Sequence, residues 1–262
     1  MTRNRLLAAC AVGAASLAFF WASMAPTPSA IPRTHLLAWR VALGSLALAF
    51  LALAAALAGR GPVRSALGLV RPRAQLGTVI LLCLGGLGLS QLADLAIAAF
   101  TPDTPVGIAS FRRTVHRLGA SSPAAPPASA TTLVTALVLL PAVAEELLFR
   151  GWMLCALRKQ VASSTAIAIC ALLFGTLHGD WLHGSAAAAL GLYFGTVVVA
   201  TGSVWPAIAC HLVNNVAAFA FAWSPPPRLP SNAILTASSL VALAGAFALL
   251  AGLYRRRPEL DR

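Results

Sequence analysis

The sequence predicts an all-α integral membrane protein, a polytopic bundle of about eight transmembrane helices. Hydrophobic residues make up 59% of the 262 residues and charged residues only 10%, and the mean hydropathy is +0.82. Apolar stretches must therefore account for most of the chain, which is typical of a protein whose main solvent is lipid.

Several stretches of the chain are apolar and long enough to form membrane-crossing helices. A hydrocarbon core of about 30 Å takes about 20 helical residues at a rise of about 1.5 Å per residue. Proline clusters separate several of the stretches, and all six tryptophans fall near predicted span ends, as expected for aromatic anchors. The predicted spans, of which the fifth and sixth are short, cover residues 6–25, 35–58, 74–100, 131–153, 163–178, 185–201, 204–222 and 233–254.

The positive charge of the chain indicates membrane topology rather than nucleic-acid binding. Nineteen Lys and Arg stand against seven Asp and Glu, a net charge of +12. The arginines lie between and beside the apolar runs, where the positive-inside rule explains them, and no nucleic-acid-binding motif accompanies them. Four basic groups lie in terminal segments or loops that an even number of predicted spans separates, so we expect all four to face the cytoplasm. They are Arg3 and Arg5; Arg60, Arg64, Arg71 and Arg73; Arg158 and Lys159; and Arg255 to Arg257.

This charge bias predicts a multi-pass protein of the cytoplasmic (plasma) membrane with both termini in the cytoplasm. Its partners would then include membrane lipids and no nucleic acid. Arg112, Arg113 and Arg117 disagree with this topology, because they fall in the long loop 101–130, which it places outside.

Two adjacent carboxylates, Glu145 and Glu146, interrupt the apolar run Leu137–Phe149. An ionisable group there costs about 2.5–3.5 kcal/mol on insertion scales, so the pair needs a partner or a function. In a helix, residues four apart share a face, so Glu146 meets Arg150 and Glu145 points elsewhere. Glu145 is then free to bind a water and act as a base. The alternative is a buried Glu–Arg pair that only ties helices together.

Two histidines and an asparagine lie in later spans. His178 closes the fifth span, and His211 and Asn215 share one helical face in the seventh. Glu145 and His178 are almost equidistant from the polar turn 159–162, so an antiparallel hairpin would place them side by side. His211 lies at a similar depth from its own turn. A lone intramembrane histidine is more often a hydrogen-bonding tie, but the combination predicts a common site in the cytoplasmic half of the bilayer.

Three segments carry a resemblance to a known family. Glu145 to Gly151, Phe174 to His178 and His211 to Asn215 resemble the EExxxR, FxxxH and HxxxN motifs of the CAAX prenyl endopeptidase and bacteriocin-processing (CPBP) family. Three ordered motifs on adjacent apolar spans are a specific signal, whereas EExxxR alone is weak. We accordingly divide the chain into N-terminal helices with a connecting loop, a protease-like core, and a C-terminal helix with a basic tail, at 1–130, 131–222 and 223–262.

The resemblance implies intramembrane hydrolysis of a peptide bond. In that family's terms Glu145 would activate a water with help from His178, and His211 with Asn215 would stabilise the developing oxyanion. Glu146 would orient the site together with the arginine of its motif, and Phe174 would support it. The substrate would be a peptide or a lipidated, CAAX-type protein. Carboxylate and imidazole can relay a proton, and imidazole and amide can both donate to one oxygen, so the chemistry permits these roles.

The sequence leaves the cofactor open. No cofactor is certain, although Glu145, His178 and His211 could ligate a divalent metal such as zinc. The HExxH spacing is absent, and the five cysteines form no CxxC pair.

Two other functions compete with the peptidase. One is a membrane scaffold or immunity-type regulator that keeps the polar residues without turnover. The other is a proton-coupled transporter, motivated by ionisable groups at depth, although no repeated halves are evident.

Overall fold

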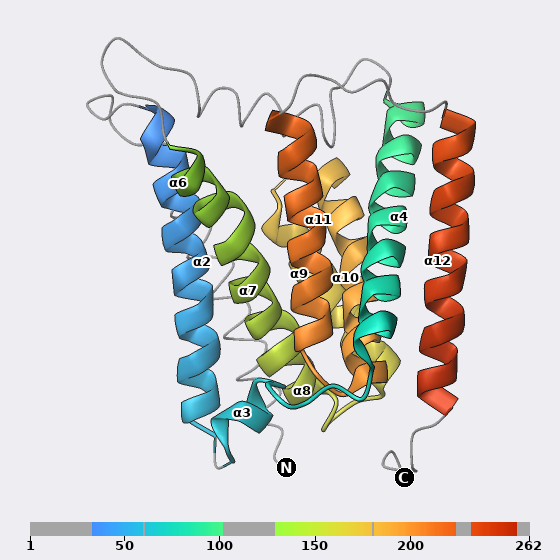
Figure 1. Ribbon diagram of the computed structural model, residues 1–262. Coiled ribbons are helices and arrows are strands. Elements are labelled where there is room, and N and C mark those ends of the chain that lie inside the picture. The colour runs from blue at the N-terminus through green and yellow to red at the C-terminus, as the bar shows by residue number, and fades with distance from the viewer. Residues whose placement is uncertain (1–32, 60, 102–128, 180, 224–231, 256–262) are drawn as a thin grey trace.

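The computed structural model describes residues 33–59, 61–101, 129–179, 181–223 and 232–255 (Figure 1). The first predicted span, 6–25, lies outside the described residues. So do Arg112, Arg113 and Arg117 of the long loop.

The described residues form helices and no strand, which confirms the all-α prediction. Six of their helices are long and apolar enough to cross a membrane, if the five consecutive segments over Ala130–Leu157 count as one, and α9 is a shorter apolar helix. The elements are α2 (Arg33–Leu57), α3 (Val63–Ala66), α4 (Leu76–Phe100), α6 (Ala130–Val134), η1 (Thr135–Leu139), α7 (Leu140–Glu146), η2 (Leu147–Met153), α8 (Leu154–Leu157), α9 (Ser163–Leu177), α10 (Trp181–Thr201), α11 (Trp205–Trp223) and α12 (Asn232–Arg255).

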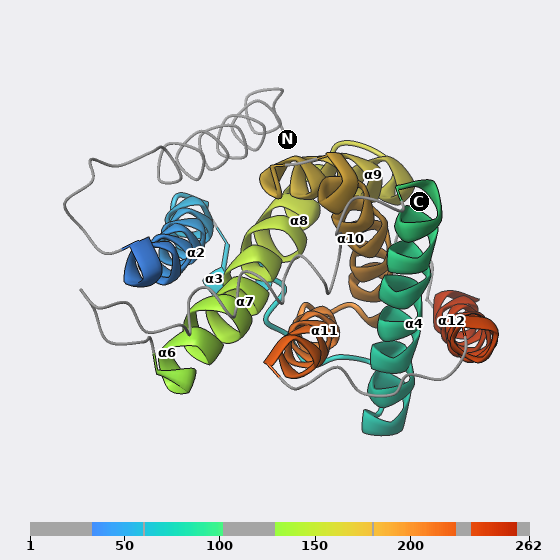
Figure 2. The ribbon, with the colours of Figure 1, turned by 90° about the horizontal axis from the view of Figure 1, so that it is seen from above.

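The helices form a bundle around the continuous helix α6–α8. In Figure 2, α2 lies on one side of this helix, and α9, α10 and α11 lie on the other. α4 packs on α10 and α11, and α12 packs on the outer side of α4. The helix that carries the two glutamates is therefore flanked on both sides, and more than half of its most apolar stretch is buried inside the protein.

The helix α6–α8 is not a regular α-helix. Two of its segments, η1 and η2, are π-helical, with wider turns than the α-helix. Pro141 follows η1 and has no backbone N–H, so the carbonyl four residues earlier cannot take its usual partner. A widened turn is one way to relieve this conflict, and such turns are frequent at functional sites. Glu145 and Glu146 end the α-helical segment between the two π segments.

The chain between α3 and α4 covers one end of the bundle. The Val204 backbone N–H donates to the Gly68 carbonyl at 3.0 Å, and the Arg73 N–H donates to the Thr201 carbonyl at 3.0 Å. Gly68 has a φ of +64°, a conformation that glycine adopts without strain. These bonds tie the α3–α4 connection to the turn between α10 and α11.

The described residues of the predicted cytoplasmic basic groups lie at this same end, whereas Arg33 begins α2 at the opposite end (Figure 1). Helix α3, the α3–α4 connection, the α8–α9 turn and the end of α12 lie together at the lower edge of Figure 1, and they carry Arg64, Arg71, Arg73, Arg158, Lys159 and Arg255. The charge pattern predicted that these basic groups would share one end of the bundle. Its assignment to the cytoplasm stays a prediction.

Candidate active site

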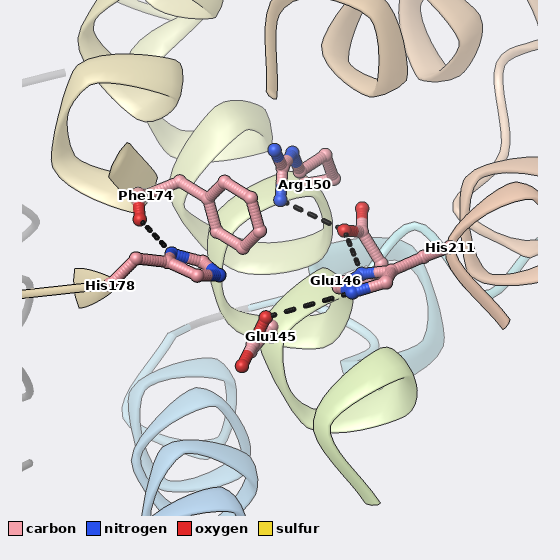
Figure 3. Close-up of polar contacts among 6 residues, drawn as sticks. All are labelled: Glu145, Glu146, Arg150, Phe174, His178 and His211. Atoms are coloured by element: carbon pink, nitrogen blue, oxygen red, sulfur yellow. Dashed lines mark hydrogen bonds and ion pairs between the residues drawn. The ribbon is translucent and has the colours of Figure 1, made fainter. Parts of the chain in front are cut away.

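The polar residues of the first motif are buried in the bundle. Glu146 and Arg150 are fully buried, and Glu145 is 8% exposed. They share the stretch where α7 passes into η2. His211 of α11 is also buried, at 6% exposure. Figure 3 shows these side chains grouped with Phe174, at the end of α9, and His178, which follows that helix.

Glu146 links Arg150 to His211. The Nη1 of Arg150 donates to Oε1 of Glu146 at 2.8 Å, which confirms the predicted pair four residues apart. The same Oε1 lies 3.0 Å from Nδ1 of His211. A carboxylate paired with arginine only accepts hydrogen bonds, so Nδ1 of His211 carries the proton and donates it. The sequence did not predict this third member, because His211 is 65 positions from Glu146.

The other nitrogen of His211 faces Glu145. Its Nε2 lies 3.9 Å from Oε2 of Glu145, which is within ion-pair range but too long for a direct hydrogen bond. With Nδ1 protonated, Nε2 of a neutral ring is an acceptor, and it becomes a donor only when the ring is an imidazolium. Glu146, on the far side of the ring, is placed to stabilise that cation.

His178 completes the group from α9. Its Nδ1 lies 3.0 Å from the Phe174 carbonyl oxygen, which can only accept, so Nδ1–H donates and Nε2 is left available. The Phe174 ring contacts the His178 ring at 4.9 Å and the His211 ring at 5.9 Å between centroids, both edge to face. Phe174 therefore contacts both imidazoles, and Figure 3 shows both turned towards the centre of the group.

Asn215 is the predicted site residue that the described contacts do not bring into the group. It follows His211 by about one turn of α11 and is partly buried. Within the described part of the chain, no hydrogen bond or ion pair joins Asn215 to Glu145, Glu146, His178 or His211.

An aromatic cage surrounds Arg150. Its Cζ lies 4.2 Å from the ring centroid of Phe174, 5.7 Å from that of Phe194 and 5.9 Å from that of Phe149. Its Nε and Nη2 are buried and have no hydrogen-bond partner. Cation–π attraction to the three rings offsets part of the lost hydration of the guanidinium. Phe149 and Phe194 were not predicted as site residues, since an isolated phenylalanine in an apolar span gives no signal of this role.

The described residues contain no group of three or more His, Cys, Asp or Glu side chains that could hold a metal ion. The Nδ1 bonds of His178 and His211 leave Nε2 of each ring available, and Nε2 of His211 lies 3.9 Å from Oε2 of Glu145. Glu145, His178 and His211 are therefore not gathered into a three-ligand site as they are placed here, and the use of a metal stays a prediction.

Comparison with known proteins agrees with the motifs. Residues 127–217 match the family model of type II CAAX prenyl endopeptidases, Rce1-like. No curated protein and no solved structure gives a significant match to the chain. The matched stretch contains every motif residue from Glu145 to Asn215. The protein is thus an integral membrane protein that is similar, over residues 127–217, to an Rce1-like protease family, in agreement with the predicted resemblance to the CPBP family.

Proposed function

We propose that this protein is an intramembrane endopeptidase that hydrolyses a peptide bond of a membrane-associated peptide or lipidated protein. One observation carries the proposal most directly: Glu146 is occupied by Arg150 and His211, whereas Glu145 faces Nε2 of His211 across 3.9 Å. A gap of this length between two polar atoms suits a bridging water. Of the two carboxylates, Glu145 is therefore the one with the geometry to activate a nucleophile.

The proposed reaction begins at that water. Glu145 takes a proton from the water while the water oxygen attacks the carbonyl carbon, which gives a tetrahedral intermediate with a negatively charged oxygen. Protonated His211, supported by Glu146, donates to this oxygen, together with the amide of Asn215. The proton held by Glu145 passes to the leaving nitrogen, with His178 as a relay, and the C–N bond breaks. The products are an amine and a carboxylic acid, and the acid then ionises by giving its proton to water.

The position of the site favours a substrate that enters from the basic end of the bundle. His211 is six residues beyond Trp205, where α11 begins, so it lies roughly 9 Å along the helix from that end. A peptide held at the membrane surface by a lipid can reach this depth. We infer that this end faces the cytoplasm of the plasma membrane, because its arginines follow the positive-inside pattern.

Replacing the proposed base tests this function. Purified protein in liposomes is given membrane-anchored peptides, including prenylated CAAX peptides, and new amino termini are quantified. Glu145→Gln is expected to abolish turnover with unchanged elution in size-exclusion chromatography, since the amide cannot accept a proton from water.

The matched control is Asp94→Asn. Asp94 is the acidic residue that the described part of the chain contains besides Glu145 and Glu146, and its neutralisation is expected to leave turnover unchanged. Full activity in Glu145→Gln would remove the proposed role of Glu145. No cleavage by the wild type with any peptide would favour the scaffold over the enzyme. The zinc alternative is tested in parallel, because a metal-dependent enzyme loses turnover on chelation and regains it with zinc.

A further inference from the structure

α10 supplies none of the three motifs, yet one of its residues contacts the polar group directly. The ring of Phe194 is stacked on the imidazole of His211, with 5.5 Å between centroids and 26° between planes. The same ring lies 5.7 Å from the Cζ of Arg150. Phe194 is 1% exposed. A single buried side chain therefore contacts both outer members of the Arg150–Glu146–His211 chain.

A hydrogen bond at one nitrogen does not fix the plane of an imidazole. His211 is bonded through Nδ1 to Glu146, so the ring can still rock about that contact and carry Nε2 with it. A flat neighbour parallel to the ring restricts this rotation. Phe174 adds a second contact, edge to face at 88°, which alone constrains the ring less because the rings meet over a smaller area.

We propose that Phe194 is a positioning residue for His211. Its stacked ring holds the plane of the imidazole so that Nε2 stays beside Oε2 of Glu145. The contribution of Phe194 to catalysis rests on the proposed hydrolytic function, whereas its effect on the orientation of the His211 ring does not. The two can therefore be tested separately.

The activity test compares three variants in liposomes. Phe194→Leu removes the ring but keeps an apolar side chain, and Phe194→Tyr keeps the ring. Phe219→Leu is the matched control, because it also breaks a stacked pair, with Trp223 at 5.6 Å and 19°, away from the polar group. Phe194→Leu is expected to lower kcat about 100-fold with little change in KM, the effect of a small misplacement of a reacting group. Phe194→Tyr and Phe219→Leu are expected to stay close to wild type.

A second measurement does not depend on turnover. Diethyl pyrocarbonate modifies accessible imidazole nitrogens, and mass spectrometry follows its addition to His211, with exposed His183 as an internal reference. Phe194→Leu is expected to speed modification of His211 several-fold relative to His183, because Nε2 is no longer held in the site. Phe194→Tyr and Phe219→Leu are expected to react like wild type.

Each outcome decides one of the two proposals. Should the wild type cleave nothing, the peptidase proposal fails, and the modification rates still test Phe194. Wild-type kcat and wild-type modification in Phe194→Leu would overturn the positioning role, as would an equal loss in Phe194→Tyr. If Phe194→Leu elutes as an aggregate, Phe194→Met takes its place against Phe194→Tyr.

Discussion

Glu146 has two partners on a single oxygen, and this sharing sets the roles of the neighbouring residues. Its Oε1 accepts from both Arg150 and His211, while its Oε2 is buried without a hydrogen-bond partner. The paired charges compensate each other where both the Arg150 and the Glu146 side chains are fully buried. Glu145 does not share these two hydrogen bonds, so its carboxylate remains available to react.

Removal of Arg150 should therefore destabilise the protein more than neutralisation of Glu145. Arg150→Ala leaves a buried carboxylate without its cation, a change that typically costs about 3–5 kcal/mol. Glu145→Gln keeps the shape of the side chain and is expected to have a much smaller effect. Thermal unfolding in detergent, followed by circular dichroism, measures both.

The double variant Arg150→Met/Glu146→Gln serves as the control for this prediction. It removes both charges, so part of the stability lost in Arg150→Ala should return. An Arg150→Ala protein as stable as wild type would show that the pair is not electrostatically important.

At the scale of the element, α10 approaches the polar group closely because it has a glycine there. A Cβ on Gly191 would lie 2.9 Å from Nη2 of Arg150 and 3.0 Å from the Cα of Ala171 in α9. Gly191 is three residues before Phe194, so both lie on the face of α10 that looks towards the site. The missing side chain leaves room for the guanidinium.

Gly191→Ala is predicted to reduce both stability and turnover. The methyl must displace Arg150 or the α9 backbone, and such overpacking costs about 1–3 kcal/mol. Gly195→Ala, about one turn later, is the matched control, because its methyl would meet the Ile167 side chain, also at 2.9 Å, away from Arg150. Unfolding temperature and kcat are measured for both. Equal losses in the two variants would show that general helix packing, and not Arg150, explains the effect.

At the scale of the whole molecule, the bundle has two chemically different ends. The connections α3–α4, α8–α9 and α10–α11 gather at one end, where the described basic loops lie, and Ser129 caps the start of α6 at the other (Figure 1). This polarity is what the positive-inside rule uses to orient a membrane protein.

Single cysteines in a cysteine-free background test the orientation. Ser65→Cys and Lys159→Cys replace exposed residues at the basic end, and Ser129→Cys replaces an exposed residue at the opposite end. In intact cells a membrane-impermeant maleimide is expected to label only Ser129→Cys, and permeabilisation should expose the other two. Labelling of Ser65→Cys in intact cells would reverse the proposed topology.

Much of the helical layout could be predicted from hydropathy. The spans predicted over 35–58, 74–100 and 233–254 differ from α2, α4 and α12 by no more than two residues at either end. The sixth span begins earlier than predicted, at Trp181, because the polar residues of that turn are already helical. The π-helical segments were not predicted, since side-chain periodicity does not report which backbone carbonyl an N–H will choose.

The sequence by itself determined the membrane class, the pairing of Glu146 with Arg150 and the identity of the motif residues. These depend on hydropathy and on spacings within one helix, which local geometry translates directly into contacts. Only the tertiary structure decided that Glu146 also binds His211, that Phe174 contacts both imidazoles, and that Phe194 stacks on His211. Those contacts join helices far apart in the chain, and their geometry follows from how whole helices pack, which no short-range pattern encodes.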